Sequence, residues 1–78
     1  MGESELAVVL RGMYENAKRN EAVCQINLFG ILYADEIKNN GYNLKTILKL
    51  SGISKGYLTE ISKGIKLSKY VTVKRESE

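Results

Sequence analysis

The chain has 78 residues, 44% of them hydrophobic, which is enough for one small domain with a limited core. It has no histidine, a single cysteine and no Gly-rich phosphate loop after a strand, so we expect no catalytic centre, no cofactor and no metal site. No apolar run reaches the roughly 18 residues of a membrane span, and the lone thiol fits a reducing, cytoplasmic setting away from membranes.

Charge is distributed unevenly along the chain. Residues 1–40 carry a net charge of −2, whereas residues 41–75 carry +7 and contain Glu60 as their single acidic residue. A basic run is usually a solvated face, but it can also hold the phosphates of a nucleic acid. A polyanion would therefore bind to the second half of the chain.

The acidic half begins with a predicted helix over about residues 4–19. Ser4 is its predicted cap, because a serine hydroxyl accepts hydrogen bonds from the free N–H groups of a first helical turn. Apolar residues at helical spacing form one stripe, which comprises Leu6, Val9, Leu10, Met13 and Ala17. This stripe predicts the face that packs on the core.

A second helix is predicted over about residues 21–39, with Asn20 as its cap. It is apolar on most sides, as expected of a central helix that several neighbours cover. Gly30 in its middle predicts close approach of another backbone. Cys24 falls within the apolar pattern and is predicted to be a buried thiol. Gly41 follows two asparagines and ends the helix.

The most informative stretch is the run from residue 44 to residue 64, where two apolar periodic segments flank a turn. The first segment predicts a helix over 43–51, whose inner face is formed by Leu44, Ile47 and Leu48, with Leu50 as a further candidate. Gly52 would end this helix in the left-handed conformation, which costs a residue with a Cβ about 1 kcal/mol. Ile53 would pin the turn against both helices.

A second helix of this stretch is predicted over about 54–63. The Ser54 hydroxyl can cap the N–H of Gly56 or of Tyr57. The inner face then consists of residues one turn apart, Leu58 and Ile61. Gly64 is predicted to end the helix.

The segment resembles the DNA-binding helix-turn-helix of bacterial and phage regulators. The matching positions are Ile47, Leu48, Gly52, Ile53, Leu58 and Ile61, in a stretch of about a quarter of the chain. The chain departs from that pattern at Leu48, because a small residue, often alanine, usually lies at the helix crossing.

Contact residues follow from the period and from the resemblance. The period leaves the outer face of the second helix to Ser54, Lys55, Gly56, Thr59, Glu60 and Lys63. The resemblance implies base-edge contacts by Lys55, Thr59 and Glu60, since lysine suits guanine acceptors and glutamate suits the cytosine amino group. Expected phosphate contacts are Lys45, Ser54, Gly56, Lys63, Lys66 and Lys69. Simple solvation is the alternative for the lysines, and Tyr57 is expected to pack at the edge of the domain.

The tail over 65–74 changes period. Val71 and Val73 alternate with polar residues, which favours a short strand. A lone strand needs a partner, so the tail either pairs with the same segment of a second subunit or runs extended across the helices.

These patterns predict a single all-α domain over 1–78, with four helices, a helix-turn-helix and a short extended or β tail. We expect it to bind double-stranded DNA, with regulation of transcription in a prokaryote or phage as the default role. Homodimerisation is expected because so small a chain buries little apolar surface alone. The alternative is a non-catalytic protein-protein interaction module, or a subunit of a larger complex, that keeps the helix-turn-helix shape.

Overall fold

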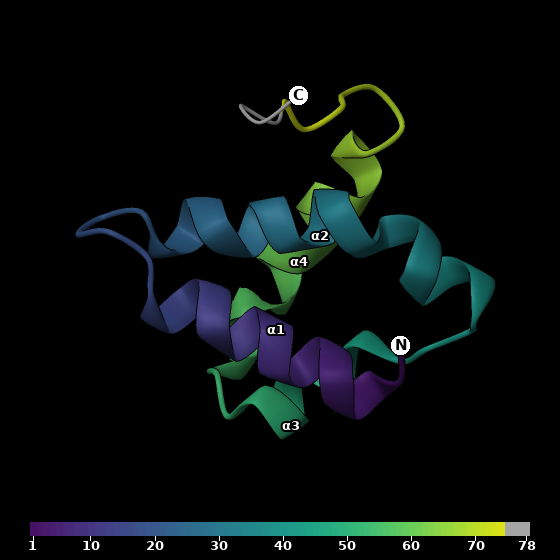
Figure 1. Ribbon diagram of the computed structural model, residues 1–78, viewed down its shortest axis with the longest axis horizontal. Helices are drawn as coiled ribbons and strands as arrows, with labels where there is room; N and C mark the ends of the chain where they lie inside the picture. The colour runs from purple at the N-terminus through teal and green to yellow at the C-terminus, as the bar shows by residue number, and fades with distance from the viewer. Residues whose placement is uncertain (75–78) are drawn as a thin grey trace.

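The computed structural model describes residues 1–74, and these residues form a small all-α domain (Figure 1). Its elements are α1 (Glu3–Glu15), α2 (Ala22–Asn39), α3 (Leu44–Ser51), a 3₁₀ turn η1 (Lys55–Tyr57) and α4 (Leu58–Leu67). The predicted all-α class with four helices is confirmed. Arg75, which contributes to the basic half of the sequence, lies outside the described residues.

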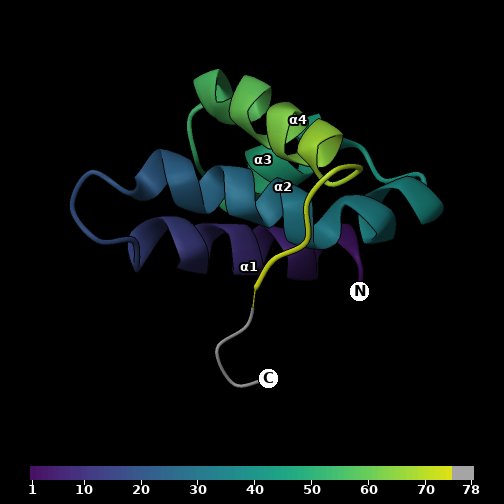
Figure 2. The same ribbon diagram turned by 90° about the horizontal axis from the view of Figure 1, so that it is seen from above.

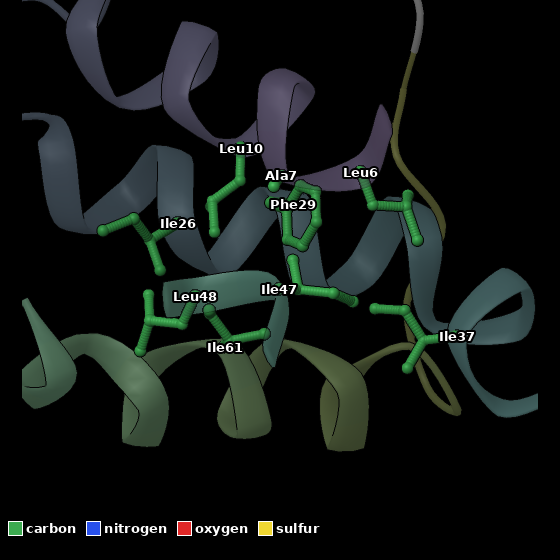
Figure 3. Close-up of a cluster of buried hydrophobic side chains, with 9 residues drawn as sticks. All are labelled: Leu6, Ala7, Leu10, Ile26, Phe29, Ile37, Ile47, Leu48 and Ile61. Carbon is green, nitrogen blue, oxygen red and sulfur yellow. The ribbon is translucent and has the colours of Figure 1, made fainter. Parts of the chain in front are cut away.

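The helices form two pairs, α1 with α3 and α2 with α4, which pack around one core. α1 and α2 run side by side, while α3 lies against α1 and α4 lies against α2 (Figures 1 and 2). Every helix contributes buried side chains to the centre (Figure 3), namely Leu6, Ala7, Leu10, Ile26, Phe29, Ile37, Ile47, Leu48 and Ile61. The inner faces of α3 and α4 therefore point into the same core as the longer helices.

The first two helices differ from the prediction at their ends. α1 begins after Gly2, so that Ser4 lies inside the first turn, and the Glu5 carboxylate accepts a hydrogen bond from the Gly2 N–H at 3.4 Å. It ends at Glu15 rather than near residue 19. Asn20 does not cap α2, because it adopts the left-handed conformation (φ 67°) and not the extended backbone that an N-cap usually has.

α2 and α4 cross at a pair of glycines. A Cβ added to Gly30 would lie 2.5 Å from the Ile61 carbonyl oxygen, and one added to Gly64 would lie 2.2 Å from the Asn27 carbonyl oxygen. The predicted close approach of a backbone at Gly30 is confirmed. Gly64, however, does not end its helix, since α4 continues to Leu67 and uses this glycine for packing.

The structure corrects one prediction about the surface and decides between the alternatives of another. Cys24 is exposed, because it lies on the side of α2 that faces away from the core. Of the two alternatives for the tail, the structure has the second: within residues 1–74 no strand forms, a turn follows α4 in which the Val71 N–H donates to the Leu67 carbonyl at 3.0 Å, and residues 71–73 run across α2 without regular structure. Without a second strand in the described chain, the alternation at Val71 and Val73 has no ladder to join.

None of the helices within residues 1–74 combines the length and the apolar character that crossing a membrane requires.

Candidate nucleic-acid interface

Side chains of α1 and the residue before α3 fix the start of α3. The Asn43 side-chain oxygen accepts hydrogen bonds from the N–H groups of Lys45 (2.8 Å) and Thr46 (3.4 Å). The Asn43 N–H in turn donates to the Glu3 carboxylate at 2.8 Å. The helix therefore starts with a satisfied cap that is tied to the first turn of α1.

The turn between α3 and η1 has the predicted glycine geometry. Gly52 is left-handed, with a φ of 77°, and ends α3. The Arg11 guanidinium donates to the Ser51 carbonyl at 3.0 Å, so α1 supports the end of α3 as well as its start. The buried Ser51 hydroxyl donates to the Leu48 carbonyl at 2.6 Å and accepts from the Ile53 N–H at 3.2 Å. Ile53 is half-buried and packs against the core, as expected of the residue that pins the turn.

The second helix of the motif starts with one tight turn. The Ser54 hydroxyl accepts a hydrogen bond from the Gly56 N–H at 3.3 Å, so the capped group is Gly56 and not Tyr57. Residues 55–57 form a 3₁₀ turn, and α4 continues from Leu58. Leu58 and Ile61 face inward, as the period predicts.

The outer side of this second segment is exposed and basic. Ser54, Lys55 and Gly56 are exposed where it starts. Farther along α4 and the following turn, the exposed positions of the predicted site are Thr59, Lys63, Lys66 and Lys69. At about 100° per residue, Thr59, Lys63 and Lys66 lie on one side of the helix, opposite Ile61. These side chains are free to meet a ligand along most of the length of α4.

Glu60 differs from the other predicted base-contact residues. Its carboxylate accepts a hydrogen bond from the Asn27 side chain of α2 at 3.3 Å and pairs with Lys63 at 3.5 Å, and its side chain is only 25% exposed. On the helical wheel, Glu60 lies toward Gly64, the residue at the α2 crossing. The prediction placed Glu60 on the outer face, whereas the structure turns its carboxylate toward α2. The single acidic residue of 41–74 is thus partly withdrawn from the basic surface.

A groove separates α3 from the start of α4. It has a volume of about 520 Å³, with Leu48, Ile53 and Leu58 along its apolar lining. Three lysines border it, namely Lys45, Lys49 and Lys55. All three are exposed, so a positive field surrounds an apolar centre.

The sequence profile of the family described as HTH-like domain matches residues 2–74. The chain belongs to this family. The match extends from α1 to the tail and supports a domain of the helix-turn-helix type. No curated protein and no solved structure matches the chain.

This HTH-like domain departs from the common helix-turn-helix pattern at Leu48. The side chain is 2% exposed and belongs to the core, and it also lines the groove. A leucine occupies more space than the small residue that usually lies at this crossing. In this chain α3 packs mainly on α1 and α4 mainly on α2, so the two helices of the motif are held from behind more than by each other.

Lys49 is a candidate contact residue that sequence reasoning missed. It lies four residues after Lys45 on α3 and borders the same groove. The i, i+4 spacing of the two lysines was visible in the sequence, and it places both on one side of a helix. The prediction concentrated on the second helix of the motif and so omitted the exposed side of the first.

Tyr57 packs at the edge of the domain, as expected. Its ring meets that of Tyr14 from α1 edge to face, with centroids 5.6 Å apart. Tyr14 also raises the pKa of Tyr57 above its ordinary value, chiefly as a hydrogen-bond partner.

Proposed function

We propose that this HTH-like domain binds double-stranded DNA, with the outer side of α4 in the major groove and the lysines of α3 on the phosphate backbone. The observation that carries the proposal is the surface formed by α3, the turn and α4: its exposed charged side chains are lysines, and its one carboxylate is turned toward α2. Such a surface attracts a polyanion, because it presents lysines and turns aside the carboxylate that would repel phosphates. Regulation of transcription by this non-catalytic domain is the proposed role.

The proposal assigns different tasks to different residues. Lys55 and Thr59 are exposed at the start of the second segment, where a recognition helix reads base edges. The flanking groups Lys45, Lys49, Lys63, Lys66 and Lys69 would contact phosphates and set affinity. Glu60 would position Asn27 and Lys63, and it would read cytosine only if DNA displaced its bond to Asn27.

The test is fluorescence anisotropy of a labelled random-sequence duplex at low and at physiological salt. We expect the affinity of the wild-type chain to fall steeply with salt, because each neutralised phosphate contributes about −0.9 to the logarithmic slope. The double variant Lys55→Glu with Lys63→Glu should lose binding. The matched control is Lys18→Glu with Arg19→Glu, which changes the net charge equally in the exposed loop between α1 and α2 and should retain most of the affinity.

Single substitutions separate reading from anchoring. Lys49→Ala should weaken binding to all sequences alike and reduce the salt slope by about one unit. Thr59→Ala should leave the slope unchanged and alter the preference among sequences once a selected site is known. Circular dichroism must show that each variant is folded.

The apolar groove favours one second candidate, a protein-interaction module. Leu48, Ile53 and Leu58 give this groove an apolar centre, which suits an apolar side chain of a protein partner better than a phosphate. A partner held mainly by apolar contacts would bind with little dependence on salt. If the wild-type chain shows no binding to DNA even at low salt, the DNA proposal is wrong and this candidate replaces it.

A further inference from the structure

The side of α2 that faces away from the core carries a regular seam. Its positions alternate in steps of three and four residues: Glu21 just before the helix, then Cys24, Leu28, Ile31, Asp35 and Lys38. This is the spacing of a heptad seam, which keeps side chains on one side of a helix over its whole length. None of the side chains that pack on the core comes from these positions.

The seam is apolar at its centre and charged at its ends. Leu28 and Ile31 are half-buried, whereas Cys24 and Asp35 on either side of them are exposed. The outermost residues are exposed and opposite in sign, Glu21 before the helix and Lys38 in its last turn. The pattern is nearly symmetric about the midpoint between Leu28 and Ile31.

We propose that this seam is the surface on which a second copy of the chain docks, with the two α2 helices antiparallel about a two-fold axis. Leu28 then faces Ile31 of the second copy, and Ile31 faces Leu28 of the second copy. Glu21 faces Lys38 of the second copy, and the symmetry repeats this ion pair at the other end. A two-fold interface must be self-complementary, and the order of charges on α2 meets this condition in the antiparallel arrangement alone. A parallel pair would bring Glu21 against Glu21 and Lys38 against Lys38.

The tail covers part of the seam, but only loosely. Residues 71–73 cross α2 over Ile31 and Leu32 (Figure 2), but a hollow of about 430 Å³ remains between the tail and the helix. Within the described part of the chain, no hydrogen bond joins residues 71–74 to α2, and Val71 is 45% exposed. A second α2 would displace this segment and place its own Leu28 and Ile31 over the hollow.

The arrangement also orients the DNA-binding helices. The axis is perpendicular to the plane that contains the two α2 helices, and α4 lies to one side of α2 (Figure 2). Both α4 helices would therefore lie on the same side of the dimer, as a dimer that reads two half-sites requires. The dimer itself does not depend on the proposed function and can be tested without DNA.

Charge reversal tests the pairing. Sedimentation equilibrium at low salt, up to about 1 mM protein, should show a concentration-dependent dimer of the wild-type chain. Glu21→Lys alone or Lys38→Glu alone should raise the dissociation constant about tenfold, since each reversal turns two attractive pairs into repulsive ones. The double variant Glu21→Lys with Lys38→Glu should restore dimerisation. Lys18→Glu, on an exposed residue outside the seam, is the control and should leave it unchanged.

Cysteine cross-linking tests the direction of the helices. In the antiparallel dimer the two Cys24 residues are displaced by about 16 Å along the helices, too far for a disulfide. Asp35→Cys places a second thiol opposite Cys24 of the other copy, so this variant should form a covalent dimer in a glutathione redox buffer. Asp35→Cys with Cys24→Ser should not, and neither should the wild-type chain.

Three results would overturn the proposal. A wild-type chain that stays monomeric at the highest concentration excludes the interface. A disulfide between wild-type Cys24 residues indicates a parallel pair. If the wild-type chain dimerises and the single charge reversals, folded by circular dichroism, have the same dissociation constant, the interface lies elsewhere.

Discussion

The two helix crossings of the motif differ in how tightly they are built. α4 meets α2 backbone to backbone at Gly30 and Gly64, where neither position leaves room for a Cβ. α4 meets α3 across a groove of about 520 Å³ that Leu48 helps to line. α4 is therefore positioned by α2 behind it, and its side toward α3 remains open.

This difference separates the residues that hold the fold from those that form the surface. The tight crossing uses small residues whose replacement must move a backbone, while the open face uses exposed lysines whose replacement moves nothing. Substitutions at the crossing should thus change stability, and substitutions on the face should change binding. The following experiments test this division.

Gly64→Ala should have the largest effect. The new methyl group would lie 2.2 Å from the Asn27 carbonyl oxygen, so α4 must move away from α2, and we expect a loss of about 2–4 kcal/mol in the free energy of unfolding. Urea denaturation measures it. Gly12→Ala is the matched control: apart from the neighbouring backbone of α1 itself, no heavy atom lies within 4 Å of the added Cβ, and the change should stabilise by up to about 1 kcal/mol. Equal stabilities of the two variants would contradict the tight crossing.

The next largest effect is expected at Ile47 in α3. Ile47 is fully buried, so Ile47→Ala should cost about 2–3 kcal/mol through lost burial and a cavity that the short α3 can partly close. Leu50→Ala should change stability by less than about 0.5 kcal/mol, because Leu50 is 54% exposed. A thermal denaturation series compares the two. A large cost at Leu50 would mean that α3 packs through a different side.

Periodicity predicted the inner faces well because burial depends on which side of a helix a residue occupies. It identified Ile47, Leu48 and Ile61 as core residues and Gly52 as the left-handed end of α3. Leu50 was the exception within α3: two residues from Leu48 on a short helix, it falls outside the inner face.

The remaining differences arise from partners that are distant in sequence. Gly64 looked like a helix end because glycine serves both as terminator and as packing residue, and only Gly30 opposite it decides between the two. Glu60 was assigned to the outer face because Asn27, which binds it, lies 33 residues earlier. Cys24 was predicted to be buried because apolar residues occur on most sides of α2. Which of these sides faces the core depends on α1 and α4, and the side that carries Cys24 is exposed.

The cap of α3 should contribute less than the core. Asn43→Ala removes the acceptor for two N–H groups and should cost about 1 kcal/mol, while Asn43→Ser retains an acceptor and should lose much less. For a domain of this size, about 1 kcal/mol corresponds to a shift in Tm of roughly 4–8 °C. If Asn43→Ala had the same Tm as the wild-type chain, the Asn43 cap would not contribute to the stability of α3.

The smallest effect concerns the exposed ion pair between the Met1 amine and Glu36, which are 2.8 Å apart. A hydrogen bond from the amine to Glu36 raises the pKa of the amine above its ordinary value of 8.0. Because the folded pKa is the higher one, the stabilisation is fully present below pH 8.0 and is lost as the pH rises through the raised value. The wild-type chain should therefore be slightly more stable than Glu36→Gln at pH 8 and below, and this difference in the free energy of unfolding should shrink as the pH is raised above 8. Urea denaturation of both proteins across that pH range measures it. Parallel pH profiles of the two proteins would show that the pair does not stabilise the fold, as is common for exposed ion pairs.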